Sequence, residues 1–131
     1  MLTRLFDRLR KTVTVTIAPG KFSFASAPRE AAIDTTVRVG AGGRILGFGD
    51  AGPTIQTQLR PIFTPGPSAA VAVDEPALVA LCRRGFSLVL GPGLNLRPRV
   101  VVRGARRAGL PQETLLRALR NAGAETVELS D

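Results

Sequence analysis

Residues 12–24 read TVTVTIAPGKFSF, so valine and isoleucine alternate with threonine up to a proline–glycine pair. Alternating apolar and polar side chains, most of them branched at Cβ, predict a β-strand over residues 12–17 with one buried face. Pro19-Gly20 marks a tight turn, and Phe22 and Phe24 begin a second strand. This stretch therefore predicts a β-hairpin.

The residues after this hairpin predict more sheet and then a loop. A third strand is expected over residues 35–39, and a glycine-rich turn at residues 40–43 leads into a fourth over residues 44–48. Residues 49–68 are rich in Gly, Pro, Thr and Gln, which is typical of a loop, and residues 69–73 are expected to be extended. The first half of the chain is thus predicted to form an antiparallel meander.

The first long helix is predicted directly after this region. Asp74 can cap a helix over residues 75–84, and Gly85 is expected to end it. Its expected inner face carries Leu78, Leu81 and Cys82. A connection rich in Gly and Pro follows at residues 91–98.

The rest of the chain predicts a strand–helix–strand unit. Three consecutive valines predict a strand over residues 99–102 of the kind that is covered on both faces. A helix over residues 111–122 begins with a proline, which suits its first turn, and a strand is expected over residues 126–129. A meander followed by such units predicts an α/β fold with a mixed sheet and helices on its faces.

Residues 2–11 have the spacing of a short amphipathic helix. Apolar side chains recur at positions i, i+3, i+4 and i+7, and charged side chains lie opposite. Such a helix can sink its apolar face into the head-group boundary of a membrane while its cations meet anionic lipids. Alternatively, the helix folds back and covers the sheet. The candidate membrane-binding residues are Leu2, Leu5, Phe6, Leu9, Arg4, Arg8 and Lys11.

The composition limits the class of protein. With 131 residues, 44% of them hydrophobic, the chain is expected to form one domain with a real core over residues 12–131, after the N-terminal segment 1–11. The single cysteine, Cys82, excludes an intramolecular disulfide, and no run of residues has the form of a membrane span or a signal peptide. We therefore expect a cytoplasmic protein, with peripheral contact to the anionic inner membrane as a further expectation.

The predicted order of elements resembles the ribonuclease-H-like half-domain of actins, Hsp70 chaperones and sugar kinases. Three stretches, which together cover nearly the whole chain, are similar to the first half of bacterial actin-like proteins of the MreB family. They are RILGFGD at residues 44–50, the run from Arg60-Pro61 through Ala72-Val73 to the helix capped by Asp74, and RPRVVV at residues 97–102 with NAGAETVE at residues 121–128. The resemblance implies a mixed sheet of about five strands plus a hairpin, with two main helices and the short N-terminal amphipathic helix.

The chain departs from this family where nucleotide would bind. In the family the first strand ends in an aspartate, and a Gly-Thr turn then holds the phosphates. The corresponding residues here are Ala18, Pro19, Gly20 and Lys21. Ala18 stands in place of the aspartate, Pro19 has no backbone N–H, and only Gly20 matches. The loop at residues 104–110 replaces the one with the family's water-activating glutamate, and Glu113 is shifted from that position.

The resemblance therefore implies a degenerate phosphate loop, with no cofactor and no hydrolysis of ATP. The chain also matches only the first of the family's two nucleotide-binding halves, so a cleft between two halves is not expected within it.

The charge of the chain favours an anionic partner. There are 18 Lys and Arg against 10 Asp and Glu, a net charge of +8, which favours lipid head groups, nucleic acid or an acidic protein. The densest cluster consists of Arg97, Arg99, Arg103, Arg106 and Arg107. It can grip phosphate, but there is no Tyr or Trp, and no Phe is interleaved with it to stack on bases. A solvated face or a protein contact is favoured over a nucleic-acid site.

Few residues are candidates for catalysis or for metal binding. The chain has no histidine, which removes the usual general base and the usual metal ligand. Pro19-Gly20-Lys21 and the glycines at residues 40–43 lack the full phosphate-binding patterns, so both are interpreted as turns. Cys82 is expected in the core. No spacing unites the remaining candidate carboxylates, which are Asp34, Asp50, Asp74 and Glu75.

The sequence thus predicts a non-enzymatic, MreB-like protein that takes part in cell-shape or envelope-associated assembly. Its expected partner is a full-length actin-like filament protein or another copy of itself, with the membrane as a second contact. Two alternatives stay open: a basic nucleic-acid-binding module, and a protein that binds nucleotide without hydrolysing it.

Overall fold

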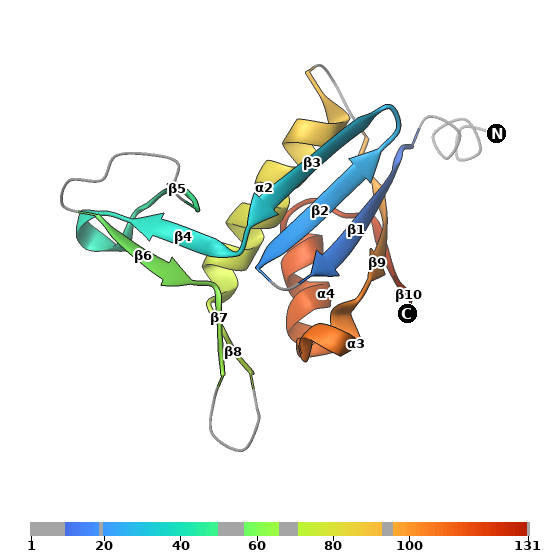
Figure 1. Ribbon diagram of the computed structural model, residues 1–131. Helices are drawn as coiled ribbons and strands as arrows, with labels where there is room; N and C mark the ends of the chain where they lie inside the picture. Colours follow the sequence, from blue (N-terminus) through green and yellow to red (C-terminus); the bar gives the residue numbers. More distant parts are fainter. Residues whose placement is uncertain (1–9, 19, 50–56, 66–70, 93–95, 131) are drawn as a thin grey trace.

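The computed structural model describes residues 10–18, 20–49, 57–65, 71–92 and 96–130. A five-stranded sheet forms its centre, in the order β10-β9-β1-β2-β3 (Figure 1). β1, β2 and β3 form an antiparallel meander, whereas β9 lies parallel to β1 and β10 lies parallel to β9. The strands are β1 (Thr12–Ala18), β2 (Lys21–Ser26), β3 (Arg29–Asp34), β9 (Arg99–Arg103) and β10 (Thr126–Ser130). The predicted mixed α/β sheet is confirmed.

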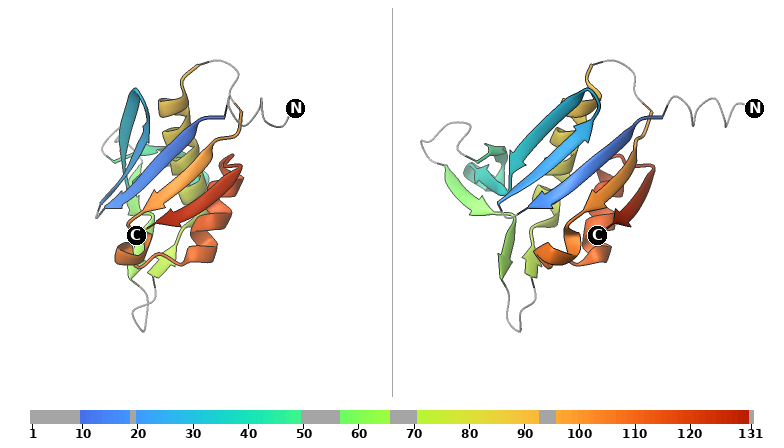
Figure 2. Two further views of the ribbon diagram at one scale, coloured as in Figure 1. Left: turned by 90° about the vertical axis from the view of Figure 1, so that its right-hand side faces the viewer. Right: turned by 45° about the vertical axis from the view of Figure 1, so that its right-hand side comes forward.

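The two main helices, α2 (Glu75–Leu90) and α4 (Gln112–Asn121), lie on the same face of this sheet (Figures 1 and 2). Side chains alternate between the two faces of a strand, so every second residue of β1 meets the helices. Val13, Val15 and Ile17 are buried there, whereas the threonines between them lie on the opposite face. The core therefore fills the space between one sheet face and the helices.

A smaller three-stranded sheet follows β3 and lies to one side of the main sheet (Figure 1). Its central strand, β4, pairs antiparallel with β5 on one edge and with β6 on the other. A two-stranded sheet, β7 with β8, then leads into α2. These elements are β4 (Thr36–Val39), the 3-10 turn η1 (Ala41–Gly43), β5 (Ile45–Phe48), β6 (Gln58–Pro61), β7 (Phe63–Pro65) and β8 (Val71–Val73).

The hairpin predicted from residues 12–24 is confirmed, but two expectations about the following strands are wrong. β3 was not predicted, because its sequence REAAID has no run of strand-forming residues; pairing with β2, which places Ile33 opposite Phe22, holds it in place. Residues 49–68 were expected to be a loop, yet they contain β6 and β7. β6 forms because it pairs with β4, with Pro61 opposite Thr36.

The first helix is longer than the sequence predicted. Asp74 caps it as expected, because its side chain accepts a hydrogen bond from the N–H of Ala77 at 3.2 Å. However, the helix continues through Gly85 to Leu90, and Gly91 ends it. A Cβ on Gly85 would lie 2.4 Å from the ring atoms of Phe24. Gly85 is therefore the position where α2 approaches β2 closely, and not a helix terminus.

Two further expectations near β9 are corrected. The segment expected to be a loop after this strand contains a short helix, α3 (Ala105–Ala108). Val101 is half-buried, whereas its neighbours Val100 and Val102 are buried. Since α2 and α4 lie on one face of the sheet, the strand is covered from one side by these helices and not from both.

Candidate functional site

A hollow of about 560 Å³ lies where β1 ends. Segments that are far apart in the sequence build it: the end of β1, the turn after it, β2, the link into β4, β7 and the region of α3. Its lining residues are Ile17, Ala18, Gly20, Phe22, Thr35, Phe63, Ala108 and Leu110. The sequence pointed to Ala18 and Gly20 and, through the resemblance, to the loop at residues 104–110, which supplies Ala108 and Leu110. The other walls come together through tertiary contacts and carry no local motif.

Two glycines with positive φ lie near the end of β1, and Gly20 also lines the hollow. Gly20 has a φ of 82°, and its carbonyl oxygen accepts a hydrogen bond from the N–H of Thr35 at 3.0 Å. Gly104 has a φ of 85°, and a Cβ there would lie 2.5 Å from the carbonyl oxygen of Ile17. The loop after β9 therefore closes onto the end of β1 because residue 104 has no side chain.

The walls of the hollow are apolar. The rings of Phe22 and Phe63 stack, with their centroids 5.6 Å apart and an interplanar angle of 16°. Of the described lining residues, Thr35 carries a side-chain hydroxyl, and none carries a charge. Such a site can hold an apolar or uncharged group, but its side chains offer no carboxylate, imidazole or thiolate to a metal ion.

The predicted degenerate phosphate loop forms part of this rim. Ala18 is the last residue of β1, and the exposed Lys21 is the first of β2, while Pro19 lies outside the described residues. Glu113 lies in the first turn of α4 and is not among the lining residues of the hollow. Within the described ranges, no group of three or more His, Cys, Asp or Glu could hold a metal ion.

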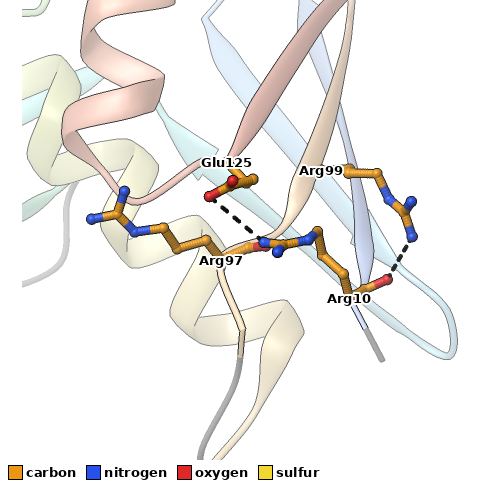
Figure 3. Close-up of polar contacts among 4 residues, drawn as sticks. All are labelled: Arg10, Arg97, Arg99 and Glu125. Carbon is orange, nitrogen blue, oxygen red and sulfur yellow. Dashed lines mark hydrogen bonds and ion pairs between the residues drawn. The ribbon is translucent and has the colours of Figure 1, made fainter. Parts of the chain in front are cut away.

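The predicted basic cluster is spread along β9. Arg99 begins this strand and Arg103 ends it, a separation of about 13 Å at roughly 3.3 Å per residue. Figure 3 shows that the start of β9 contacts the residues just before β1. Nη2 of Arg99 donates a hydrogen bond to the carbonyl oxygen of Arg10 at 3.1 Å. Arg10 in turn donates to the carbonyl oxygen of Arg97 at 2.6 Å and forms an ion pair with Glu125 at 3.7 Å. These contacts fasten the start of β1 to the start of β9.

The other two arginines of the cluster belong to α3, beyond the far end of β9. Arg106 is exposed there, and Arg107 follows it in the same short helix. Arg97 and Arg99 therefore lie toward one end of β9, and Arg103 and Arg106 toward the other.

The predicted amphipathic helix falls almost entirely on residues 1–9, which lie outside the described residues. The next two residues, Arg10 and Lys11, are not helical and lead directly into β1. Nζ of Lys11 donates to the carbonyl oxygen of Leu90, the last residue of α2, at 3.2 Å, where a cation complements the helix dipole. Within the described part of the chain, no helix is long and apolar enough to cross a membrane.

The candidate carboxylates that are described serve local structure. Asp34 accepts hydrogen bonds from the N–H and hydroxyl of Thr36, at 3.2 and 3.0 Å. Glu75 accepts two hydrogen bonds from the guanidinium of Arg117, which lower the pKa of this carboxyl group. These contacts and the cap formed by Asp74 lie within or between elements and explain each group without a ligand. Asp50 lies outside the described residues.

Cys82 belongs to the core, as the sequence predicted. It is fully buried on the inner face of α2. Burial raises the pKa of its thiol to about 12, because the low-dielectric interior disfavours the thiolate. The thiol is therefore protonated near neutral pH and acts as a small apolar side chain.

Comparison with known proteins identifies the fold. No protein-family model and no curated protein matches the chain. Among solved structures, MreB5 of Spiroplasma citri bound to AMPPNP matches with a TM-score of 0.67 and 13% identity, over 93% of this chain and 38% of that chain. The same protein bound to ADP matches with a TM-score of 0.68, at the same identity and coverage. The expected actin-like fold is thus confirmed, and the chain spans 38% of the length of the MreB5 chain.

Proposed function

We propose that this chain is a non-catalytic, actin-like module that takes part in a cell-shape or envelope-associated assembly through contacts with other proteins. The observation that carries the proposal is the uncharged hollow at the end of β1. It occurs in a fold that 93% of the chain shares with a protein solved with AMPPNP and with ADP. The proposal is supported by this shared fold together with Ala18, which stands where the resemblance implies an aspartate.

Hydrolysis of ATP needs groups that the side chains of the described lining residues do not offer. Mg²⁺ requires oxygen ligands, commonly from carboxylates, and the developing charge on the phosphates requires cations and backbone N–H groups aimed at them. Ala18 brings a methyl group to the end of β1, and Phe22 and Phe63 bring rings to the adjoining wall. A charged polyphosphate would lose its water against these apolar walls without gaining hydrogen bonds from them, so binding it there would be unfavourable.

Protein contacts are supported by a second surface feature. Leu46 on β5 and Leu88 on α2 are each 38% exposed, and both line one open hollow between the smaller sheet and that helix. Apolar side chains gathered in a hollow are a common feature of protein contact sites. We propose that the partner is a full-length actin-like filament protein or a second copy of this chain.

Membrane contact is the second part of the proposal and rests on the sequence of residues 1–11. Four large apolar side chains on one helical face could each contribute about 1.5–3 kcal/mol when buried, and each nearby cation about 1 kcal/mol at an anionic surface. Leu5→Asp and Phe6→Asp are each expected to abolish sedimentation with liposomes that contain anionic lipid. Undiminished sedimentation of both variants would contradict membrane binding by this segment.

The non-catalytic part is tested by titration calorimetry with ATP and Mg²⁺ together with an assay of phosphate release. We expect no heat of binding and no release above buffer, with MreB5 of Spiroplasma citri as the nucleotide-binding control. Measurable turnover by the purified chain would refute the proposal. Heat without turnover would favour the one alternative that the position of the hollow supports, which is nucleotide binding without hydrolysis.

The assembly part is tested by affinity capture from the protein's own cells, with the full chain and with residues 12–131 as baits. Recovery of an actin-like filament protein or of envelope components is the expected result. Recovery of nucleic acid alone, with binding that weakens steeply as salt rises and survives loss of residues 1–11, would favour the nucleic-acid alternative.

A further inference from the structure

β5 is an edge strand, and an open hollow runs along its free side. It is the first strand in the order β5-β4-β6, so one of its edges has no neighbouring strand within the described part of the chain. Successive side chains of a strand point to opposite faces, so a run of neighbouring residues lines one hollow when the edge of the strand forms the wall. Four consecutive residues of β5 do so here. The lining residues of this edge hollow, of about 430 Å³, are Ile33, Ile45, Leu46, Gly47, Phe48, Arg84 and Leu88.

The backbone of β5 has groups that β4 does not use. The N–H of Gly49 donates to the carbonyl oxygen of Thr36 at 2.9 Å, and residues of an antiparallel strand alternate between facing their neighbour and facing away from it. The N–H and C=O of Phe48, the preceding residue, therefore point to the free edge. The register with β4 also skips Leu46, which has no partner residue there.

The sequence of β5 leaves this edge unshielded. Natural sheets commonly protect their edges with charged side chains or prolines, which discourage a further strand from pairing. The other edge strands of the two larger sheets follow this rule, since β3 reads REAAID, β6 reads QLRP and β10 reads TVELS. β5 reads ILGF and contains neither a charge nor a proline. Its edge is therefore suited to accept another strand.

The residues that α2 contributes to the edge hollow indicate which side chains such a strand would carry. Arg84 and Leu88 are four apart, so they share one face of the helix about 6 Å apart at 1.5 Å per residue. Alternate residues of a strand also share a face, about 6.6 Å apart at 3.3 Å per residue. Two side chains at alternate positions of an extended segment thus have the spacing to meet Arg84 and Leu88 together.

The charge and the exposed leucines specify the two side chains. Arg84 is exposed, and no described carboxylate forms an ion pair with it, so a carboxylate is the group that its guanidinium is suited to bind. Leu46 and Leu88 are each 38% exposed and offer apolar surface to the second side chain. A second copy of this chain is disfavoured, because the net charge of +8 makes copies repel one another.

We propose that the free edge of β5 pairs with an extended segment of a partner protein, which carries an acidic and an apolar residue two positions apart for Arg84 and Leu88. This inference rests on the proposed function in protein assembly and names how one partner segment binds. Backbone hydrogen bonds to an open strand edge supply affinity in such contacts, and the alternate side chains supply specificity.

The test is NMR of the backbone amides of the whole chain, with the peptide acetyl-TVEVLT-amide as the probe. We expect saturable shifts of the Leu46, Gly47 and Phe48 amides, and roughly tenfold or slower hydrogen exchange at Phe48 when the peptide is in excess. No saturable shift at these residues would overturn the inference.

Two further peptides test whether the backbone forms the contact. One is methylated on the nitrogens of its second and fourth residues, and the other on those of its third and fifth. Only one side of an added strand faces β5, so one of these peptides should lose binding and the other should keep it. Loss in both, or retention in both, would show that strand pairing is not the mode of binding.

Variants locate the two side-chain contacts. Arg84→Gln should weaken binding of the glutamate peptide two- to fivefold, as should the glutamine version acetyl-TVQVLT-amide on the unaltered chain. Arg120→Gln, at an exposed arginine of α4, is the control for net charge and should have no effect. Leu88→Ala should weaken binding, whereas Leu59→Ala, at the exposed leucine of β6, should not. Equal losses within either pair would contradict the proposed position of the segment.

Hydrogen exchange without peptide tests the other occupants of this edge. If the Phe48 amide is already protected in dilute protein, the chain covers the edge itself, and if protection rises with protein concentration, a second copy does. Either result refutes the inference. All these measurements use purified protein and peptides, so they can fail while affinity capture still recovers a partner. The inference and the proposed function are therefore refuted by different results.

Discussion

Gly85→Ala tests how closely α2 packs against the main sheet. In an ordinary helix interior, replacing glycine by alanine stabilises the fold by about 1 kcal/mol. Here the added Cβ would lie 2.4 Å from the ring of Phe24, a separation at which the ring or the helix must move. Phe24 is 1% exposed and also contacts Phe86 edge-on, with centroids 6.0 Å apart, so the ring has little room.

Overpacking of a core typically costs about 1–3 kcal/mol, which outweighs the gain in helix propensity. We therefore expect a net loss of up to about 2 kcal/mol in the free energy of unfolding, measured by urea denaturation with circular dichroism. A domain of this size should lose roughly 3–5 °C in Tm for each kcal/mol. Ser87→Ala, at an exposed position of the same helix, is the matched control and should be neutral or slightly stabilising.

A double variant checks the mechanism. Phe24→Leu removes the ring atoms that the new Cβ would meet, so Gly85→Ala should cost much less in that background, or even stabilise it. A higher urea midpoint for Gly85→Ala alone would refute the close approach of α2 to β2. An equal cost with and without the ring would refute Phe24 as its cause.

The remaining predictions concern single sites. Gly104→Ala and Gly20→Ala both place a side chain at positive φ, which costs about 1–2 kcal/mol each. Only the Cβ at residue 104 would also meet a backbone carbonyl oxygen, at 2.5 Å, so Gly104→Ala should lower the urea midpoint further. Equal losses in the two variants would contradict the closure of the loop after β9 onto β1. Cys82, whose thiol has its pKa raised to about 12, should resist a thiol reagent at pH 8 in the native protein and react fully in urea; rapid native reaction would show that the thiol is accessible. Hydrogen bonds from Arg117 lower the pKa of Glu75 in the folded chain below its ordinary value of 4.5. The ion pair between Glu75 and Arg117 therefore stabilises the fold fully above pH 4.5, and this stabilisation is lost as the pH falls through the lowered pKa of the folded state. Glu75→Gln should therefore reduce stability at pH 7 but not near pH 2; an equal difference at both pH values would contradict this.

The two proposals differ in how directly the sequence suggested them. The lack of an acidic residue at the end of β1 is visible as Ala18 once the resemblance supplies the alignment. The free edge of β5 carried no such sign, because the run ILGF at residues 45–48 predicts a strand but does not show on which side the strand is paired. That depends on strands and side chains that the chain brings to it from elsewhere.

Local patterns in the sequence were sufficient for the elements whose side chains alternate or are capped. Interactions within a few residues determine whether these segments form a strand or a helix. Examples are the alternating valines and threonines of β1, the cap formed by Asp74 and the consecutive valines of β9. The absence of histidine and the single cysteine likewise limited the chemistry without any structure. These features need no knowledge of what lies across the fold.

Tertiary contacts determined the rest. β3 and β6 have weak local signals and form because β2 and β4 offer unpaired backbone groups to them. Gly85 has the local sign of a helix end, yet packing against Phe24 makes it an interior residue of α2. The hollow at the end of β1 likewise combines residues as distant as Ile17 and Leu110. Pairing and packing join residues that are far apart along the chain, and a pattern read over neighbouring residues does not contain that information.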